Sequence, residues 1–234
     1  MPHDAYEVVG RPGAILYTCE HASNRVPKPW RPRPGDRVLL ASHWGYDIGA
    51  AAVTRRLARM TPGIGVLSRW SRLLLDPNRE PTDPTAVLTE TDDGAPRFNH
   101  VVDLPGRVAR FHAPFHAAVD DALTRHRPRW LWSIHSFTPT FRGRARPMEA
   151  GVLFDRHDDA CARLCGVLND LGLRTELNEP YSGKAGLISS AARHGARHDV
   201  PYLEIEVRQD LVASRSGARR VAAILHRAQV RAGF

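Results

Sequence analysis

The chain alternates short apolar runs with longer segments of helical periodicity, and this alternation restricts the fold more than any other feature. The apolar runs lie at 14–18, 64–68, 72–76, 130–135, 151–155 and 202–207. They lack clean polar alternation, which is typical of strands covered on both faces. Helices are expected at 48–60, 105–126, 158–171, 186–196 and 215–231. The pattern predicts a three-layer α/β domain, whose mixed, mostly parallel sheet carries helices on both faces.

The length of 234 residues favours one domain, which we expect to span 1–234. No linker-like stretch divides the chain, so the proline-rich segment 26–36 and the polar segment 81–99 are expected to be surface loops. The first residues lack the apolar stretch of a signal peptide, and no segment has the length and apolarity of a membrane span. We therefore expect a cytoplasmic protein.

The formal net charge is +8, which raises nucleic acid as a possible partner. The only lysines are Lys28 and Lys184, and the many arginines are spread along the chain among acidic residues, so a nucleic-acid role is not favoured. A small molecule is the expected ligand. The three cysteines, Cys19, Cys161 and Cys165, suggest a reducing compartment, and the last two are expected in the core.

Several polar residues follow predicted strands, where ligands bind in open α/β sheets. His21 and His135 each leave a strand among small polar residues and are the best imidazole ligands for a metal. A hydrolytic zinc site needs about three protein ligands and an open position for water. Asp47 is the preferred third ligand, although an aspartate before a helix can equally be an N-cap. His43 is a reserve ligand.

Glu204 and Glu206 stand two apart in an apolar strand, so both side chains point to one face. Burying two ionised carboxylates raises the free energy of the folded state unless a cation lies beside them. One interpretation pairs a glutamate with Arg208, which continues the same face. The other makes Glu206 a general base that takes a proton from water.

The segment 71–81 ends in residues suited to binding a substrate carboxylate or amide. Arg79 offers a planar fork and Asn78 an amide group, whereas Asp76 could equally belong to an Asp-Pro-Asn turn. The loop 178–184 is a second polar segment suited to an anionic or amide group. We predict that Ser136, which follows His135, and Asn178, which opens that loop, also contact the substrate.

Two weaker arrangements are also present. His112 and His116 have the i,i+4 spacing of a helical metal site, but Pro114 between them disrupts the hydrogen bonding and no acidic partner completes a metalloprotease signature. Cys19 stands near His21, but residues i and i+2 of a strand seldom form a thiol–imidazole pair. Neither arrangement displaces the predicted metal site.

An ordered set of motifs resembles the N-formylglutamate amidohydrolase family, from about residue 14 to 212. The motifs are CEHASNRVP, HWGYDIGA, SRLLLDPNRE, FHAPFH, HSF, NEPYSG and LEIEVRQDL. The resemblance implies a zinc-dependent hydrolase with an α/β fold similar to that of zinc carboxypeptidases, and cleavage of a formyl amide from an acidic amino acid.

The resemblance also implies roles for particular residues. His21, Asp47 and His135 match the metal-ligand positions and Glu206 the position of the base, while Asn78 and Arg79 match the substrate-binding motif. His116 and Gln209 also match recurring positions. Glu20 stands where a proline is more usual and His43 where an acidic residue is more usual, so the chain resembles a broader branch of the family.

We therefore predict a hydrolase that binds one zinc ion and removes a formyl or acyl group from a small acidic N-acyl amino acid. Glu20 could support His21 from behind or form a surface ion pair. The alternatives are a metal-dependent peptidase with the same site and a non-catalytic nucleic-acid-binding protein on the same fold.

Overall fold

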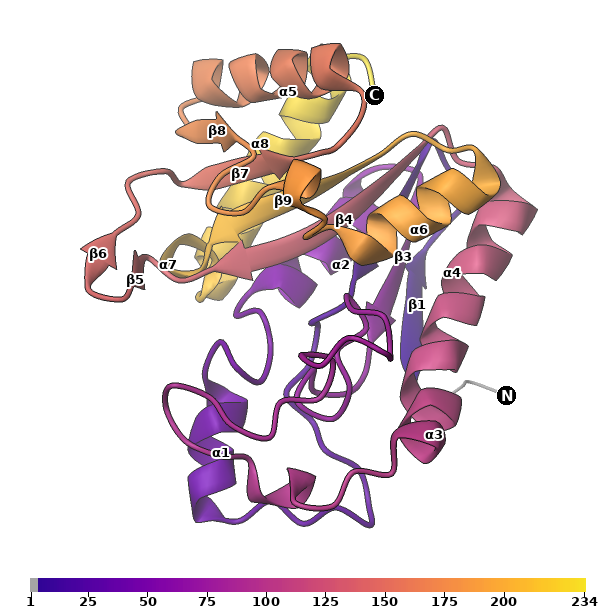
Figure 1. Ribbon diagram of the computed structural model, residues 1–234. Coiled ribbons are helices and arrows are strands. Elements are labelled where there is room, and N and C mark those ends of the chain that lie inside the picture. The colour runs from indigo at the N-terminus through magenta and orange to yellow at the C-terminus, as the bar shows by residue number, and fades with distance from the viewer. Residues whose placement is uncertain (1–3) are drawn as a thin grey trace.

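A seven-stranded sheet forms the middle layer of the protein in a computed structural model, which describes residues 4–234 (Figure 1). Its strands are β1 (Tyr6–Gly10), β2 (Ile15–Cys19), β3 (Gly63–Ser68), β4 (Trp130–Phe137), β7 (Ala150–Leu153), β8 (Thr175–Leu177) and β9 (Tyr202–Arg208). The order is β1-β3-β2-β4-β9-β7-β8. The four central strands β3, β2, β4 and β9 are parallel, whereas β1 and β7 run antiparallel to their neighbours β3 and β9. The predicted mixed, mostly parallel α/β fold is confirmed.

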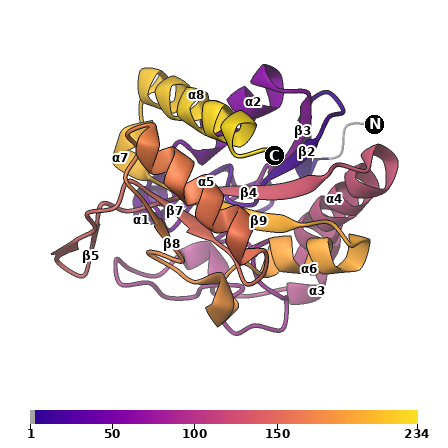
Figure 2. The ribbon, with the colours of Figure 1, turned by 90° about the horizontal axis from the view of Figure 1, so that it is seen from above.

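Helices cover both faces of this sheet. They are α1 (Pro34–Ala41), α2 (Ala50–Met60), α3 (Leu104–Arg107), α4 (Ala113–His126), α5 (Asp158–Asp170), α6 (Ser189–His198), α7 (Gln209–Val212) and α8 (Arg215–Arg231). Short 3₁₀ turns lie at Arg97–Asn99 and Gly183–Ala185. The view from above shows α5 and α8 crossing the near side of the sheet (Figure 2). Among residues 4–234, no helix combines the length and the apolar character that a membrane crossing requires.

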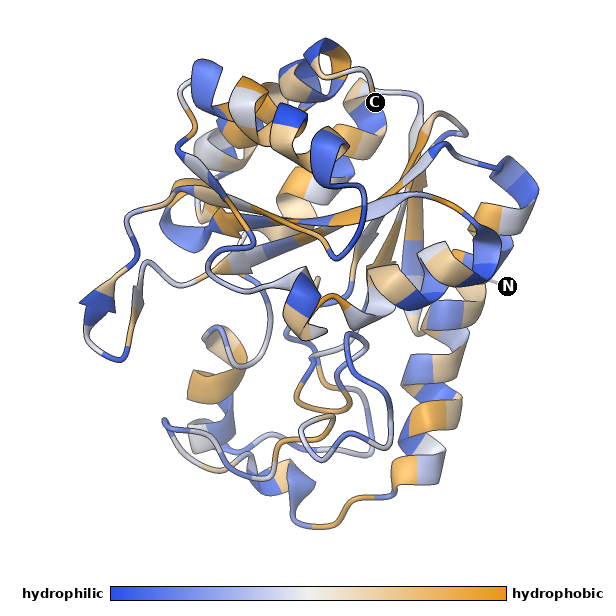
Figure 3. Cartoon of the chain, turned by 45° about the horizontal axis from the view of Figure 1, so that its top comes forward, coloured by the Kyte–Doolittle hydropathy of each residue, from blue (hydrophilic) through white to orange (hydrophobic). Residues whose placement is uncertain are grey.

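The strands have two buried faces because alternate side chains enter different cores. Ile15 and Tyr17 pack in the core shared with α2, α5 and α8, whereas Leu16 between them packs in the core shared with α4 and α6. In the helices, hydrophobic and hydrophilic residues are interleaved, as expected for one buried face (Figure 3). Strand burial on both sides explains why the apolar runs lack polar alternation.

The second halves of β4 and β9 break this apolar pattern on one face only. Ile134 and Ile205 continue the core of α2, α5 and α8. His135 and Glu206, which face each other across the β4–β9 pair, are also buried but polar, and Ser133 pairs with Glu204 in the same way. This face therefore gathers chemical groups at the carboxyl ends of parallel strands.

The predicted strand at 72–76 is wrong. These residues form turns, with Leu74 N donating to Ser71 O and Asp76 N donating to Ala86 O. Leu73 and Leu74 are fully buried, but they pack in small clusters with α1 and the segment before α4 rather than in the sheet. Burial without periodicity does not distinguish a strand from a buried turn.

Several elements were not predicted, among them β1, β8 and α1. The strands β1 and β8 lie at the two edges of the sheet and are partly exposed, so their sequences lack an apolar run. The helix α1 begins at Pro34, inside a segment expected to be a loop, and the Asp36 side chain accepts a hydrogen bond from Arg33 N at its start. Edge strands and short capped helices bury little apolar area, which leaves a weak signal.

The predicted helix at 105–126 is present but interrupted. It consists of α3, a turn of π-helix at Val108–His112, and α4. Pro114 lies in the first turn of α4, directly after the π turn, and has no N–H to donate to the preceding turn. The π turn joins α3 to α4 without a break in the helical backbone, and His112 is its last residue.

Candidate active site

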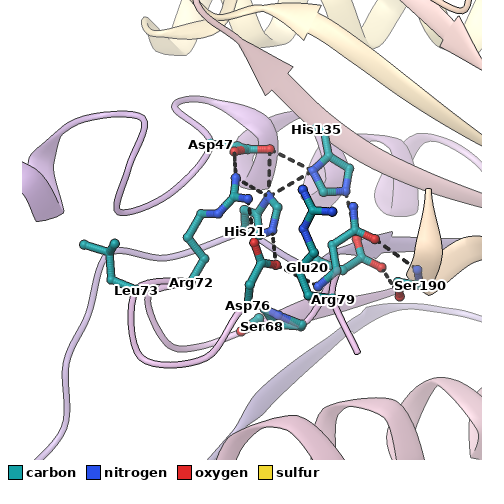
Figure 4. A network of polar contacts seen from close by, with 12 residues as sticks. Glu20, His21, Asp47, Ser68, Arg72, Leu73, Asp76, Arg79, His135 and Ser190 are labelled. Atoms are coloured by element: carbon teal, nitrogen blue, oxygen red, sulfur yellow. Dashed lines mark hydrogen bonds and ion pairs between the residues drawn. The ribbon is translucent and has the colours of Figure 1, made fainter. Parts of the chain in front are cut away.

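His21, Asp47 and His135 come together from three separate elements. His21 follows β2, His135 lies on β4, and Asp47 precedes α2. The N-cap of α2 is Gly49, in the left-handed region with φ 85°, so Asp47 does not cap the helix. Its side chain instead faces the two imidazoles (Figure 4). Backbone bonding fixes the arrangement, because Asp47 N donates to His21 O over 3.0 Å.

The three candidate ligand atoms form a compact triangle. Asp47 Oδ2 lies 2.8 Å from His135 Nδ1 and 3.3 Å from His21 Nδ1, and the two Nδ1 atoms are 3.1 Å apart. All three side chains are buried. Zn–N and Zn–O bonds of about 2.0–2.1 Å at tetrahedral angles would separate the ligand atoms by roughly 3.3 Å. The donor set and its spacing therefore fit a zinc ion.

A buried carboxylate stands behind each imidazole. Asp76 Oδ1 lies 2.7 Å from His21 Nε2, and Glu20 Oε2 lies 3.2 Å from His135 Nε2. Such contacts fix the tautomer of a metal-binding histidine and orient its ring. Asp76 thus has a functional contact as well as a turn-forming one, since its Oδ1 also accepts from Asn78 N.

Glu20 supports His135 rather than His21. It is fully buried, and its two oxygens accept hydrogen bonds of 2.7 Å from Ser133 Oγ and Ser190 Oγ. The carboxylate is turned toward β4 and α6, and Asp76 rather than Glu20 contacts His21 Nε2. The predicted surface ion pair is therefore also wrong.

The electrostatics of the cluster favour a cation. Burial works against the charged form of Asp47, yet the charges and hydrogen bonds of His21 and His135 hold the pKa of Asp47 well below its usual range. Burial likewise opposes protonation of His135, but Glu204, Asp47 and Glu20 hold the pKa of that imidazole well above its usual value. A proton and a metal ion would compete for this nitrogen.

Arg72 reaches the same centre. Its guanidinium bonds to Asp76, and Nη1 lies 3.2 Å from His21 Nδ1. The sequence reasoning missed this residue because the turn at 71–79, unlike the predicted strand, brings Arg72 back beside Asp76. The i,i+4 spacing of this arginine and aspartate was the available signal.

Glu204 and Glu206 stand beside the imidazole of His135, and each has an Oε2 without a hydrogen-bond partner among residues 4–234. Burial raises the pKa of Glu204 to about 7 and that of Glu206 well above its usual value. Arg208 pairs with neither, because its guanidinium bonds to Asp210 and to the carbonyls of residues 146–148. The predicted Arg–Glu pair is wrong.

A cavity of about 230 Å³ opens over the cluster. Its wall contains all three candidate ligands and both glutamates, together with His43, Trp44, Arg72, Asn78, Arg79, Leu88, Ser136, Phe137, Thr138, Phe141, Tyr181 and Leu187. Asn78 Oδ1 accepts from Ser190 N, which leaves the amide NH₂ to donate to a ligand. His43 packs against Trp44, and its pKa is lowered by burial.

Two predicted substrate residues take other positions. Asn178 lies outside the residues that line the cavity, and its Oδ1 accepts from Phe154 N and Gly183 N, so it shapes its own loop. Tyr181 from the same loop reaches the cavity instead. Ser136 lines the cavity, but its hydroxyl donates to Ile48 O and its N–H to Asp47 Oδ2.

His112 and His116 do not converge on a metal position. His112 Nε2 lies 3.0 Å from Arg79 O, and His116 Nε2 lies 3.0 Å from Pro77 O. Asp120, His194 and His198 form a further group with closely spaced ligand atoms, but Arg197 already neutralises Asp120. Cys19 is buried, and burial raises the pKa of its thiol to about 12, which makes it a poor nucleophile.

The comparisons with known proteins identify the family of the chain. A model of the N-formylglutamate amidohydrolase family matches residues 13–213, so the chain belongs to that family. Its members hydrolyse amide bonds, and the predicted resemblance is confirmed. A comparison with curated protein sequences finds no match.

Solved structures show the same fold. A gene product from Agrobacterium tumefaciens shares 28% identity over 98% of this chain and 94% of its own, with a TM-score of 0.90. An N-formylglutamate amidohydrolase from Ralstonia eutropha shares 18% identity over 97% and 96%, with a TM-score of 0.75. A bacteriophage poly-gamma-glutamate hydrolase shares 14% over 97% and 89%, with a TM-score of 0.51.

Proposed function

We propose that this protein is a zinc-dependent hydrolase that removes a formyl group from a small acidic N-formyl amino acid. One observation carries the proposal: two imidazoles and a carboxylate converge with ligand-atom spacings of 2.8–3.3 Å at the floor of the cavity. His21, Asp47 and His135 would hold the metal. When bound there, a zinc ion would polarise the amide carbonyl and acidify a water molecule beside it.

Glu206 is the residue that takes the proton from water. It lies on the cavity wall beside His135, with one carboxylate oxygen free of hydrogen bonds within residues 4–234. Burial favours its protonated form, so it holds a transferred proton readily and can return it to the leaving nitrogen. A cation at the three ligands would lower its pKa and leave the carboxylate ready to accept.

Asn78, Arg79 and Arg72 are the groups that bind and orient the substrate. Arg79 presents a planar fork to a carboxylate, and Asn78 offers its amide donors. Arg72, which contacts His21 on the cavity side, is placed to stabilise negative charge that develops on the amide oxygen. A cavity of about 230 Å³ suits a small substrate better than a long peptide.

The decisive experiment combines metal analysis with a substrate panel. Purified protein is expected to contain one zinc per chain and to hydrolyse N-formyl-L-glutamate faster than N-acetyl-L-glutamate or a short peptide. Glu206→Gln should lower kcat by about 10²–10⁴-fold and keep its zinc. Glu204→Gln serves as the matched variant on the same strand face. Near-normal turnover by Glu206→Gln would overturn the assignment of the base, and preference for the peptide would overturn the substrate.

A further inference from the structure

A chain of hydrogen bonds runs from the loop that carries Asn78 and Arg79 through His116 on α4 and His194 on α6 to Asp120 on α4. Pro77 O lies 3.0 Å from His116 Nε2, and His116 Nδ1 lies 2.8 Å from His194 Nε2. His194 Nδ1 in turn lies 2.8 Å from Asp120 Oδ1. Both imidazoles are buried, at 2% and 0% exposure. The ring planes are inclined by 29° and the ring centroids are 5.0 Å apart, as for rings that meet through their nitrogens.

These contacts require more protons than two neutral imidazoles hold. The carbonyl of Pro77 only accepts, so His116 Nε2 must carry a hydrogen, and the carboxylate of Asp120 demands one on His194 Nδ1. The nitrogens that face each other over 2.8 Å would then both be bare. One additional proton between them completes all three hydrogen bonds and gives the pair a positive charge opposite Asp120.

The same loop is held at two further points. His112 Nε2 lies 3.0 Å from Arg79 O, and Ser190 N donates to Asn78 Oδ1 over 3.0 Å. Ser190 and His194 belong to α6, whereas His112 and His116 belong to the segment that enters and begins α4. The segment that enters and begins α4 and the helix α6 therefore bond to three successive residues, 77–79.

We propose that His116 and His194, with one shared proton, are positioning residues that hold Asn78 and Arg79 in register for the substrate carboxylate. This inference rests on the proposed function of that loop. When the shared proton is lost, two lone pairs face each other and the contact between the imidazoles weakens. The loop then loses one of its anchors, so substrate binding weakens while the machinery at His21 and His135 is unchanged.

The charged groups around the two imidazoles determine the pH at which the shared proton is lost. His116 faces His112 from its own segment, His194 and Arg193 from α6, and Glu20 from the end of β2. His194 faces Asp120 from α4 together with Arg193 and Glu20, and Asp120 also receives Arg197 and His198. Burial lowers the pKa of both His116 and His194, and Asp120 works against this for His194.

Paired substitutions at His116 separate the two contacts. Asn places its amide near Nδ1 and loses the contact with Pro77, whereas Gln places a donor near Nε2 and keeps it. His116→Asn should raise KM for N-formyl-L-glutamate about fivefold to tenfold with little change in kcat, because the loop binds ground state and transition state alike. His116→Gln should restore KM to within about twofold of the wild type at about pH 5, where the wild type retains the shared proton.

The pH profile is the readout that a merely structural role would not change. Because burial lowers the pKa of both imidazoles below the usual 6.5, KM of the wild-type enzyme should rise as the pH increases toward about 6.5 and the shared proton is lost. In His116→Gln this rise should disappear, whereas the control His198→Gln, which also removes a bond to Asp120 Oδ1, should retain it. Identical KM profiles in the wild type and His116→Gln would overturn the proposal.

A spectroscopic test needs no turnover. Proton NMR of the wild type at about pH 5, below the usual pKa of histidine, should show a strongly downfield imidazole resonance that His116→Gln abolishes and His198→Gln keeps. Its absence from the wild type would overturn the shared proton even if N-formyl-L-glutamate is a good substrate. A second metal per chain that is lost in His198→Gln would also overturn the proposal, because Asp120, His194 and His198 would then be ligands.

Discussion

Two buried pairs of histidines in this protein have similar spacing and different chemistry. His21 and His135 approach through nitrogens 3.1 Å apart, and His116 and His194 through nitrogens 2.8 Å apart. The first pair has a carboxylate behind each ring and a third, Asp47, in the gap that opens on the cavity. The second pair ends on one carbonyl and one carboxylate, so a single proton satisfies it.

The difference shows what would favour a metal ion at one pair and not at the other. Closeness of two imidazoles is common to both pairs, whereas an excess of acceptors around the gap is found only at His21 and His135. Three buried carboxylates around two rings leave negative charge that a divalent cation would neutralise. The outer partners of the rings, rather than the distance between them, separate a metal centre from a structural hydrogen-bond chain.

The largest expected effect comes from removing one imidazole from each pair. His135→Gln should abolish stoichiometric zinc binding, because it removes a candidate ligand, whereas His116→Gln should keep one zinc per chain. Metal analysis after dialysis against a weak chelator measures both. Equal zinc content in the two variants would erase the distinction between the pairs.

A smaller effect is expected from the carboxylates behind the rings. Asp76→Asn keeps the shape of the side chain but weakens the hold on His21 Nε2, so zinc affinity should fall about 10–100-fold. Asp120→Asn, the matched change in the second pair, should leave zinc affinity unchanged. Competition with a chromophoric chelator gives both affinities, and a loss of zinc in Asp120→Asn would show that the second pair holds metal.

The smallest expected effect is on stability. Burial opposes the charged form of Asp120, but hydrogen bonding from His198 and the charge of His194 keep its pKa below the usual 3.8. The stabilisation is therefore present above pH 3.8 and is lost as the pH falls through the lowered pKa. Asp120→Asn should lower the free energy of unfolding by about 1 kcal/mol at neutral pH.

Urea unfolding of metal-loaded protein at neutral pH and near pH 3 measures this difference. The gap between Asp120→Asn and the wild type should shrink in acid, where the carboxyl group of the wild type also becomes neutral. A gap that persists unchanged at low pH would mean that Asp120 contributes through packing rather than through charge.

The cluster of His21, Asp47 and His135 could be predicted from the sequence because its parts lie at strand ends and near a helix start. Apolar runs locate β2, β4 and β9, and parallel strands bring the residues that follow them to one edge. His21, His135 and Glu206 could therefore be placed near one another before any coordinates were known. For Asp47 the sequence left ligand and cap equally open, and the position of Gly49 at the cap rules out the cap.

The parts that could not be predicted depend on turns and long-range contacts. Arg72 was hidden by the wrong strand at 72–76, since an extended segment would carry it away from Asp76. His194 gave no signal, because its partner His116 is 78 residues away and the two meet only after α4 and α6 pack. Local periodicity shows which face of an element is buried, but not which other element covers it.

The residues that line the cavity come from two kinds of element, the central sheet and a turn outside it. This difference affects how members of the family can change their substrate. His135 and Glu206 project from strands in the middle of the sheet, whereas Asn78 and Arg79 belong to a turn outside it. Exchange of that turn, together with the helical residues that grip it, would alter which molecule is recognised and leave the hydrolytic apparatus intact. Natural relatives are therefore expected to diverge in substrate preference through this one segment while they share a common reaction.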